Sequence, residues 1–319
     1  KIKCPKCGKE ISRIKDVGNP WLDAGIVPFS TMDKKWFPAE LVCESFPGQF
    51  KNWFYSLIVM SAVLEDINPM KTVFGFASVK DEKGEEMHKS KGNAIWFDDA
   101  VEKIGADVMR WMYSRQNPVN DLKFGYGPAE EMKRKLLTLY NVFTFFNTYV
   151  DKEDFPKKKI NSKNILDKWI TSKINNLIKK ATKDLDEYDI SSAVLAIENF
   201  FIEDLSLWYI RRSRKRFHKG ADKREETIST LYYLLLDLLK LIAPIMPFSA
   251  EEMHSSLKID SMPESIHLCD WPKAGKIDNK LEEKMNQVRE IVNLALAQRA
   301  EAKIKVRQPL AKLTIKNKL

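Results

Sequence analysis

Residues 87–111 read MHKSKGNAIWFDDAVEKIGADVMRW, in which a lysine-rich turn is followed at Gly105 by the segment GADVMRW. The turn places two lysines, Lys89 and Lys91, beside small and hydroxyl-bearing residues. Flexible loops of this composition hold phosphate oxygens, since lysine is a mobile point charge that follows developing negative charge. A solvated turn without function has the same local composition, so the composition alone leaves both interpretations open.

The composition of the whole chain favours a globular protein of about two domains. Its 319 residues include 53 Lys+Arg and 44 Asp+Glu, for a formal net charge of +9. With 44% apolar and 30% charged residues, the chain can bury a core and is not disordered by composition. Four cysteines are too few for a secreted disulfide scaffold, and the chain opens at Lys1 without an apolar leader. We therefore expect a cytoplasmic protein without a signal peptide.

One apolar segment, residues 231–248, has nearly the length of a membrane span. Asp237, Lys240, Pro244 and Pro247 interrupt it, whereas a lipid-spanning helix needs about 20 apolar residues with few charges. The segment therefore predicts a buried core helix that ends at Pro244, and no membrane association.

Glycine usage divides the chain into two parts. Ten of the 12 glycines lie between Gly8 and Gly127, and the last 192 residues contain only Gly220 and Gly275. Short apolar runs in the first part are typical of strands joined by turns and helices. In the second part apolar residues recur at spacings of three and four, which predicts long amphipathic helices. These expected helices cover residues 165–178, 193–207, 231–242 and 285–302.

The segment Cys4-Pro5-Lys6-Cys7-Gly8 has the pattern of half a zinc knuckle. Two thiolates at this spacing suit one edge of a tetrahedral site, which needs four ligands. The other two cysteines, Cys43 and Cys269, lie in apolar settings, and the sequence contains no second pair. Either the other ligands precede Lys1 or the pair is vestigial, so the sequence leaves open whether Cys4 and Cys7 bind Zn²⁺.

The motifs resemble those of the class I aminoacyl-tRNA synthetases, and among them the isoleucyl type. In that family a KMSKS loop ends in Gly-Asn and precedes a Gly-Ala-Asp-x-x-Arg helix, much as Met87–Asn93 precedes Gly105–Arg110 here. Upstream, Trp21–Gly25 is similar to the family's WFDSG. Trp53–Ser56 is similar to the strand-to-helix turn beside its amino-acid pocket.

Further motifs extend the resemblance to the end of the chain. Trp208–Arg214, with the sequence WYIRRSR, resembles an isoleucyl-type signature of the anticodon-binding bundle. Ala243–Phe248 and His267–Pro272 match the same bundle, and Ile304–Leu310 resembles the start of the C-terminal region. The motifs occur in the family's order and cover essentially the whole chain.

The resemblance implies an α/β plus all-α fold, in which the second half of a Rossmann-like class I catalytic domain is followed by a helical anticodon-binding bundle. Residues 1–16 would be the tail of an editing insertion with half a zinc knuckle. Residues 17–127 would be the C-terminal half of the catalytic domain with the KMSKS-like loop. Residues 128–275 would form the anticodon-binding domain, and residues 276–319 would begin the C-terminal region.

The resemblance also assigns roles to residues of the activation site. Lys89 would be the catalytic lysine, which neutralises pyrophosphate as it leaves ATP. The residues of the ATP site would be Met87, His88, Lys89, Ser90, Gly92 and Asn93. Those of the aminoacyl-adenylate pocket would be Trp21, Glu44, Gln49 and Trp53. The two tryptophans would be the walls around the isoleucine side chain, although tryptophans at such positions also serve plain core packing.

The densest basic run of the chain covers residues 211–219. Arginine suits phosphates and guanine edges, and an aromatic ring beside it can stack on an unpaired base. The resemblance therefore implies that tRNA binds at Trp208, Tyr209, Arg211, Arg212 and Arg214. On a regular helix Arg212 shares a face with Arg216 rather than with Arg211, so not all of these cations would touch one RNA surface.

The chain departs from the family pattern at several positions. Glu86 and His88 stand where the family has its first lysine and first serine, and Gly48 occupies the position of an aspartate that contacts the adenylate. The family's first ATP signature needs two closely spaced histidines. The four histidines here lie far apart, at positions 88, 218, 254 and 267. We therefore expect the C-terminal portion of such an enzyme, inactive in amino-acid activation without an N-terminal half.

Three functions follow from the resemblance. The first is a part of an isoleucyl-tRNA synthetase, which uses ATP with Mg²⁺ to activate isoleucine and transfers it to isoleucine tRNA. Its partners would be that tRNA, isoleucine, ATP and the N-terminal half of the enzyme. The second is a tRNA-binding module derived from a synthetase and without catalysis. The third is the same reaction with valine or leucine, against which the signature Trp208–Arg214 argues.

Overall fold

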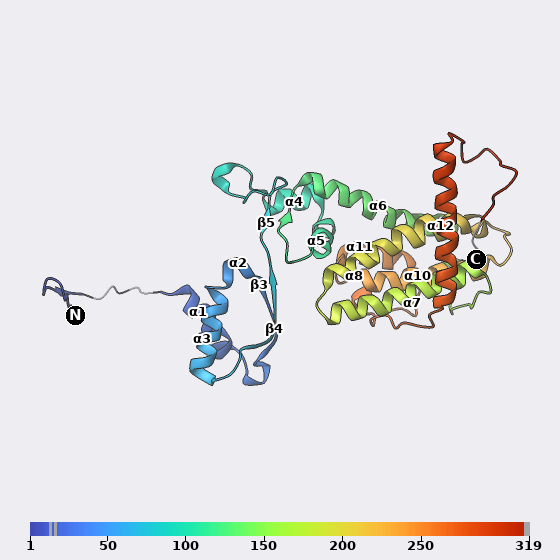
Figure 1. Ribbon diagram of the computed structural model, residues 1–319. Coiled ribbons are helices and arrows are strands. Elements are labelled where there is room, and N and C mark those ends of the chain that lie inside the picture. Colours follow the sequence, from blue (N-terminus) through green and yellow to red (C-terminus); the bar gives the residue numbers. More distant parts are fainter. Residues whose placement is uncertain (13–14, 16–17, 316–319) are drawn as a thin grey trace. The chain divides into compact units, whose positions relative to one another are not determined.

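The computed structural model describes residues 1–12, 15 and 18–315 (Figure 1). The chain forms two compact units, each with its own hydrophobic core. Unit 1 comprises residues 1–86 and 118–123, and unit 2 comprises residues 87–117 and the chain from residue 124 onward.

Unit 1 is built around a pair of parallel strands, β3 (Ala39–Ser45) and β4 (Met70–Phe76). Parallel neighbours need a crossover connection, and here α2 (Phe46–Gln49) and α3 (Trp53–Glu65) provide it. The strand, crossover and strand enclose a small apolar core. Its buried members are Val42, Phe54, Leu57 and Met70.

The helix α1 (Pro20–Thr31) packs on α3. Its start is fixed by Asn19, whose side chain accepts hydrogen bonds from the backbone N–H groups of Trp21 and Leu22. Gly25 faces α3 so closely that a Cβ atom there would lie 2.8 Å from the backbone of Ser56. The two helices therefore approach at a distance that only glycine permits.

Short elements complete unit 1. The strands β1 (Ile2–Lys3) and β2 (Glu10–Ile11) form an antiparallel hairpin, and a 3₁₀ turn, η1, covers Lys34–Trp36. The strands β5 (Val79–Lys80) and β6 (Leu122–Lys123) pair in parallel, which returns residues 118–123 to this unit.

Unit 2 is helical. Short 3₁₀ turns, η2 (Lys89–Lys91), η3 (Lys152–Asp154), η5 (Arg214–Phe217) and η6 (Ile266–Leu268), connect longer helices. A π-helix, η4, covers Phe200–Ile210 and continues into the short helix α9 (Arg211–Ser213). The other helices are α4 (Phe97–Ile104), α5 (Ala106–Arg115), α6 (Tyr126–Tyr149), α7 (Ile165–Asp186), α8 (Ile190–Asn199), α10 (Arg224–Ile242), α11 (Pro247–Leu257) and α12 (Asn279–Glu301).

The core of unit 2 holds most of its large aromatic side chains. Trp111, Trp169, Tyr209 and Tyr232 are fully buried. The apolar residues 231–242 lie within α10 and are largely buried, and the helix ends two residues before Pro244. Within the described residues, no helix is long and apolar enough to cross a membrane.

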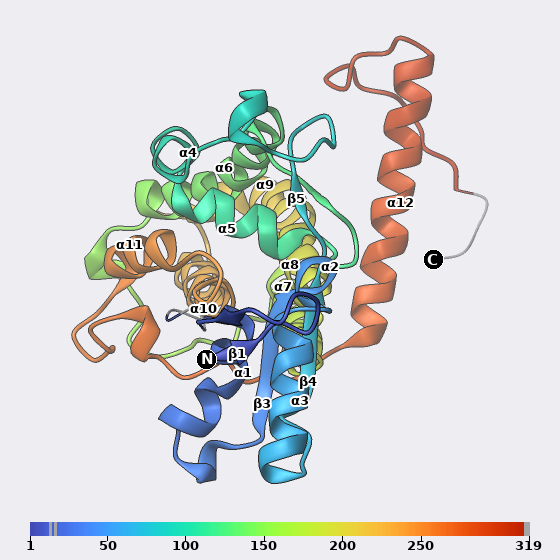
Figure 2. The same ribbon diagram turned by 90° about the vertical axis from the view of Figure 1, so that its left-hand side faces the viewer.

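The C-terminal helix α12 has two differing halves. Its first half packs against α7, and Glu282 and Met285 are buried there. Its second half has no buried residue. Figure 2 shows α12 standing at the edge of the helical unit.

Residues 87–117 belong to the helical unit, although the sequence places the change of fold near residue 127. The reason is a set of contacts between α5 and the bundle. The Trp111 indole N–H donates to the carboxylate of Glu198 on α8, at 3.2 Å. Arg110 donates to the carbonyl oxygens of Ile245 and Pro244, at 2.8 and 2.9 Å.

Asp107 forms a further contact of the same kind. Its carboxylate accepts the backbone N–H of Ser249 in the first turn of α11, at 2.6 Å. The segments GADVMR and APIMPF, which both carry the family resemblance, therefore hold each other in place. The chain that follows the lysine-rich turn is fixed to the helical bundle by these bonds.

We expect Gly25→Ala to destabilise unit 1 by about 1–3 kcal/mol, because the added methyl group forces α1 away from α3. Hydrogen exchange of the α1 and α3 amides measures the effect. Gly18→Ala is the matched control, since a Cβ there meets no atom within 4 Å. Equal exchange in the two variants would contradict the close helix contact.

Candidate active-site and RNA-binding residues

The lysine-rich turn is closed by its own hydrogen bonds. The backbone N–H of His88 donates to Asn93 Oδ1 at 2.9 Å, which joins the two ends of the turn. Between them lies the 3₁₀ turn η2, which ends at Gly92 with φ of +71°. Glycine adopts this left-handed conformation without strain, so the turn presents Lys89 and Lys91 on a compact frame.

Lys89 points to an aromatic neighbour. Its Nζ lies 4.5 Å from the centroid of the Trp96 ring, and 57% of Trp96 is exposed. A cation–π contact at such an exposed position is worth about 0.5–1 kcal/mol. The ammonium group is therefore held near the turn by an interaction that a phosphate can readily displace.

Three of the expected pocket residues lie together in unit 1. Glu44 stands near the end of β3 and accepts the backbone N–H of Ser45 at 2.7 Å. Gln49 Oε1 accepts the backbone N–H of Trp53 at the start of α3, at 3.3 Å. All three therefore surround the crossover at the carboxyl end of a parallel strand, which is where open α/β sheets bind ligands.

The two expected pocket tryptophans differ in burial. Trp53 packs against the small core beside Phe54, with 5.7 Å between ring centroids. Trp21 lies in the first turn of α1 and is 40% exposed. Each lies within one turn of the point where Gly25 meets Ser56, so each is near the contact between α1 and α3.

An apolar cavity of about 520 Å³ lies beside this crossover and is lined by side chains of α2, α3 and β4. The sequence does not predict this cavity, because its aromatic residues have the spacing of an ordinary core. The lining includes Phe46, Phe50, Phe54, Tyr55, Ile58 and Met70.

The cysteine pair forms a tight turn within the first hairpin. The backbone N–H of Gly8 donates to the Cys4 carbonyl oxygen at 2.9 Å, and Gly8 has φ of +69°. The backbone N–H groups of Cys7 and Lys6 lower the pKa of the Cys4 thiol, which favours the thiolate. In the described part of the chain, however, no three His, Cys, Asp or Glu side chains come together as metal ligands. The described residues therefore bring together no more than two of the four ligands that a zinc site requires.

Tyr209 is not available to RNA. Its side chain is fully buried and its hydroxyl donates to Asp167 Oδ1 at 2.8 Å. Burial, and then the charge of Asp167, raise the pKa of the tyrosine well above its usual value. The Tyr209 ring therefore offers no exposed surface to an RNA base, because it lies on the side of the π-helix that faces the core.

Trp208 is also covered. Only 7% of it is exposed, and its indole N–H donates to the sulfur of Met285 at 3.3 Å. The guanidinium carbon of Arg212 lies 3.2 Å from the ring centroid. In this arrangement the ring of Trp208 has almost no exposed surface on which an RNA base could stack.

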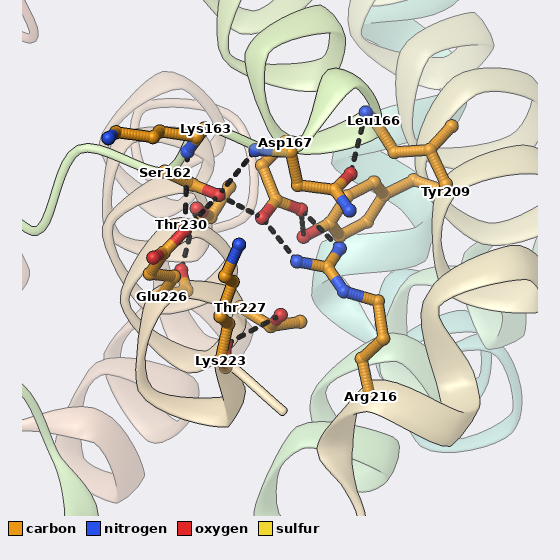
Figure 3. A network of polar contacts seen from close by, with 11 residues as sticks. Ser162, Lys163, Leu166, Asp167, Tyr209, Arg216, Lys223, Glu226, Thr227 and Thr230 are labelled. Carbon is orange, nitrogen blue, oxygen red and sulfur yellow. Dashed lines mark hydrogen bonds and ion pairs between the residues drawn. The ribbon is translucent and has the colours of Figure 1, made fainter. Parts of the chain in front are cut away.

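The basic run divides between interior and surface. Arg216 points inward and donates to both carboxylate oxygens of Asp167, at 2.7 and 2.6 Å (Figure 3). Arg211, Arg212 and Arg214 are exposed. Arg214 donates to the Tyr149 hydroxyl at 3.2 Å. Three of the five residues expected to bind tRNA thus face solvent.

Ser162 extends the network around Asp167. Its hydroxyl lies 2.7 Å from Asp167 Oδ2 and 2.8 Å from a carboxylate oxygen of Glu226 (Figure 3). The bond with Ser162 lowers the pKa of Glu226. The network joins the segment before α7, the start of α10 and the end of the basic run.

Two models of protein families match the chain. The model of class I tRNA synthetases (I, L, M and V) matches residues 2–125, and the model of the anticodon-binding domain of tRNA ligases matches residues 167–315. The chain belongs to the class I aminoacyl-tRNA synthetase family.

Curated relatives within this family are named isoleucine–tRNA ligase. The protein of Clostridium novyi (strain NT) is 38% identical over an alignment that covers 100% of this chain and 32% of the relative. The protein of Pyrococcus furiosus is 35% identical, over 97% of this chain and 30% of the relative. The chain spans about a third of the length of the curated relatives it matches.

Solved structures share the family fold. The ternary LeuRS–tRNA–LeuAMS complex of Agrobacterium radiobacter K84 superposes with a TM-score of 0.61, at 18% identity, over 88% of this chain and 35% of that one. The Mycobacterium tuberculosis methionyl-tRNA synthetase with methionyl-adenylate gives 0.58, at 19% identity, over 71% and 45%. The expected α/β plus all-α fold, with a partial Rossmann-like domain and a helical domain, is confirmed.

We expect Asp167→Asn to destabilise unit 2 by about 3–5 kcal/mol, because Arg216 then keeps a half-buried charge without its partner. Urea denaturation followed by far-UV circular dichroism measures the loss. The control is Asp151→Asn, which removes an exposed pair with Lys219 and should leave the midpoint unchanged. Equal midpoints for both variants would show that the buried pair does not stabilise the fold.

Proposed function

We propose that this chain is part of an isoleucine–tRNA ligase, which activates isoleucine with ATP and transfers it to isoleucine tRNA. One observation carries the proposal: proteins named isoleucine–tRNA ligase, from bacteria and archaea, align over 97–100% of the chain. The closed turn that presents Lys89 supports it, because the reaction needs a mobile cation at the phosphates.

In the activation step the isoleucine carboxylate attacks the α-phosphate of ATP, the bond to the bridging oxygen breaks, and pyrophosphate leaves. Positioning and charge stabilisation dominate such a step. Lys89 would leave the Trp96 ring and follow the charge that develops on the pyrophosphate. Backbone groups near Ser90 and Gly92 would shape the phosphate site, with Met87, His88 and Asn93 as its frame. Mg²⁺ would accompany the ATP phosphates and offset part of their charge.

The amino-acid pocket in this proposal is formed at the crossover of unit 1. Trp21 and Trp53 would enclose the branched side chain, which loses water there without stranding polar atoms. Glu44 and Gln49 would supply the polar contacts to the adenylate, and Gly48 contributes no side chain. Such a pocket separates isoleucine from valine by only about 1–3 kcal/mol, the value of one methylene group.

The helical unit would bind isoleucine tRNA through Arg211, Arg212 and Arg214. We keep the four-part division at residues 16, 127 and 275 as part of this proposal. The four free cysteines fit a reducing compartment, so the proposal places the protein in the cytoplasm.

A second function, a tRNA-binding module without catalysis, is favoured by one observation. None of the four histidines forms the closely spaced pair of the family's first ATP signature. In this proposal the chain alone binds tRNA but does not activate isoleucine. Activation would require the rest of the enzyme as a partner.

We expect no isoleucine-dependent ATP–pyrophosphate exchange from this chain alone. We expect activity from a chimera in which the chain replaces the matching third of the Clostridium novyi relative. In that chimera Lys89→Ala should slow activation about 10²–10³-fold with little change in isoleucine affinity, because the charge acts on the transition state.

Lys91→Ala is the matched control in the same turn, and it should slow activation less than about tenfold. Pre-steady-state formation of the adenylate separates the two effects. If Lys91→Ala is the more damaging change, the catalytic assignment of Lys89 is wrong. Exchange by the isolated chain clearly above background would refute its inactivity.

We expect tRNA binding to weaken steeply with salt, with a log–log slope of about −0.7 to −0.9 for each phosphate contact. Filter binding of isoleucine tRNA and an unrelated tRNA, from low to physiological salt, measures it. Replacing Lys157, Lys158 and Lys159 together should weaken both tRNAs equally, if at all. A slope near zero would contradict RNA binding by this surface.

A further inference from the structure

Two arginines from distant parts of the sequence lie against one indole ring. The guanidinium carbon of Arg212, in α9, is 3.2 Å from the centroid of Trp208. That of Arg289, in α12, is 5.4 Å from the same ring and 5.8 Å from Trp169. Guanidinium groups prefer such stacked positions, which fix the plane of the group and leave its N–H edge free to donate.

The ring that carries these arginines is itself fixed by α12. The Trp208 N–H donates to Met285 Sδ, and Met285 lies one turn before Arg289. Arg289 also pairs with Asp204, a carboxylate that is 8% exposed and binds Lys173 at 3.2 Å. Its other terminal nitrogen donates to the Glu203 carbonyl oxygen at 3.2 Å, so most of its N–H groups are already in use. The arrangement therefore exists only where α12 packs on the π-helix.

The start of α12 is anchored to α7 by a separate contact. The hydroxyl of Ser172 donates to the buried carboxylate of Glu282 at 2.5 Å. This bond lies two turns before Arg289 and involves neither arginine. The two guanidinium groups are therefore held in place before any ligand arrives, which lowers the cost of ordering them on binding.

Two further arginines, Arg211 and Arg289, act on the charge of Arg212. Burial, followed by the positive charges of Arg211 and Arg289, lowers the pKa of Arg212, the direction expected when like charges repel. Within the described part of the chain, Arg211 and Arg212 form no ion pair. Arg212 donates only to the carbonyl oxygens of Leu207 and Trp208, both at the long distance of 3.4 Å.

A bound anion would relieve this repulsion and give the guanidinium edges better acceptors. Phosphate matches the arginine edge with two parallel hydrogen bonds, which are stronger than bonds between neutral groups. We propose that Arg212, held on the face of Trp208 with Arg289 behind the same ring, forms a binding site for a phosphate group. The natural ligand, a phosphodiester of the tRNA backbone, rests on the function proposed above. Trp208 is then a positioning residue and does not stack on a base.

The test compares single-charge variants of the full chain for tRNA affinity and for its salt dependence. Arg212→Gln should weaken tRNA binding about 5–20-fold and reduce the slope of the log–log salt plot by about 0.7–0.9, the value of one phosphate contact. Arg212→Lys should restore the slope but little of the affinity, because lysine cannot form the paired hydrogen bonds. Arg134→Gln, which removes an exposed arginine on α6, is the matched control and should change affinity less than twofold.

The role of Trp208 is tested by a double-mutant cycle. Trp208→Leu acts through Arg212 and Arg289, so it should add little to the loss that Arg212→Gln already causes. Additive losses, with a larger effect on isoleucine tRNA than on an unrelated tRNA, would instead show a direct base contact and overturn the positioning role. Trp208→Phe repeats the cycle in case the leucine variant does not fold, as judged by circular dichroism.

Two outcomes separate the site from the proposed function. If the wild-type chain binds tRNA and Arg212→Gln binds it equally well with the same slope, the phosphate site is refuted while the function stands. If the wild-type chain binds no tRNA, calorimetric titration with inorganic phosphate decides. Saturable binding that Arg212→Gln abolishes and Arg134→Gln retains would support a site for free phosphate, and its absence would refute the site.

Discussion

Asp167 is a carboxylate with 1% of its surface exposed, and its neutralisation is the constraint on which the helical unit depends. A buried carboxylate is tolerated only when it is paired and fully hydrogen-bonded. Here Arg216 supplies two charge-assisted bonds, and the hydroxyls of Tyr209 and Ser162 supply the others. These partners come from the π-helix, from the turn that follows it and from the segment before α7. One side chain thus fixes the positions of three parts of the chain.

This constraint sorts the basic run into two groups. Arg216 is used inside the unit, and its inward direction leaves Arg211, Arg212 and Arg214 on the outer surface. Since Tyr209 and Arg216 are held by the same carboxylate, the short segment between them has little freedom to turn its cations elsewhere. The ion pair of the interior therefore determines which arginines of the basic run face solvent.

Much of the fold could be predicted from the sequence, because it depends on local patterns. The apolar spacing located α7 and α10, and the density of glycine separated the α/β part from the helical part. The sequence did not reveal the π-helix, because its residues keep the apolar character of an ordinary helix. It also did not reveal that α5 belongs with the bundle, since the bonds of Asp107 and Arg110 reach partners more than a hundred residues away.

In the candidate site, too, the sequence predicts features formed by neighbouring residues better than features that depend on distant ones. The turn around Lys89 was recognisable because its chemistry lies within seven consecutive residues. The burial of Trp208 and Tyr209 could not be predicted from the sequence, because an aromatic ring has the same chemistry in a core as on an RNA surface. Only the burial of the rings, and the partners Met285 and Asp167, distinguish the two roles.

The most direct test asks whether the exposed arginines of the basic run, those not paired with Asp167, bind RNA. Phenylglyoxal modifies accessible arginines, and mass spectrometry measures the modification with and without isoleucine tRNA. The account predicts that Arg211, Arg212 and Arg214 react in the free chain and are protected by tRNA, while Arg216 is unreactive in both states. Equal modification of the three exposed arginines with and without tRNA, under conditions where the tRNA is bound, would contradict it.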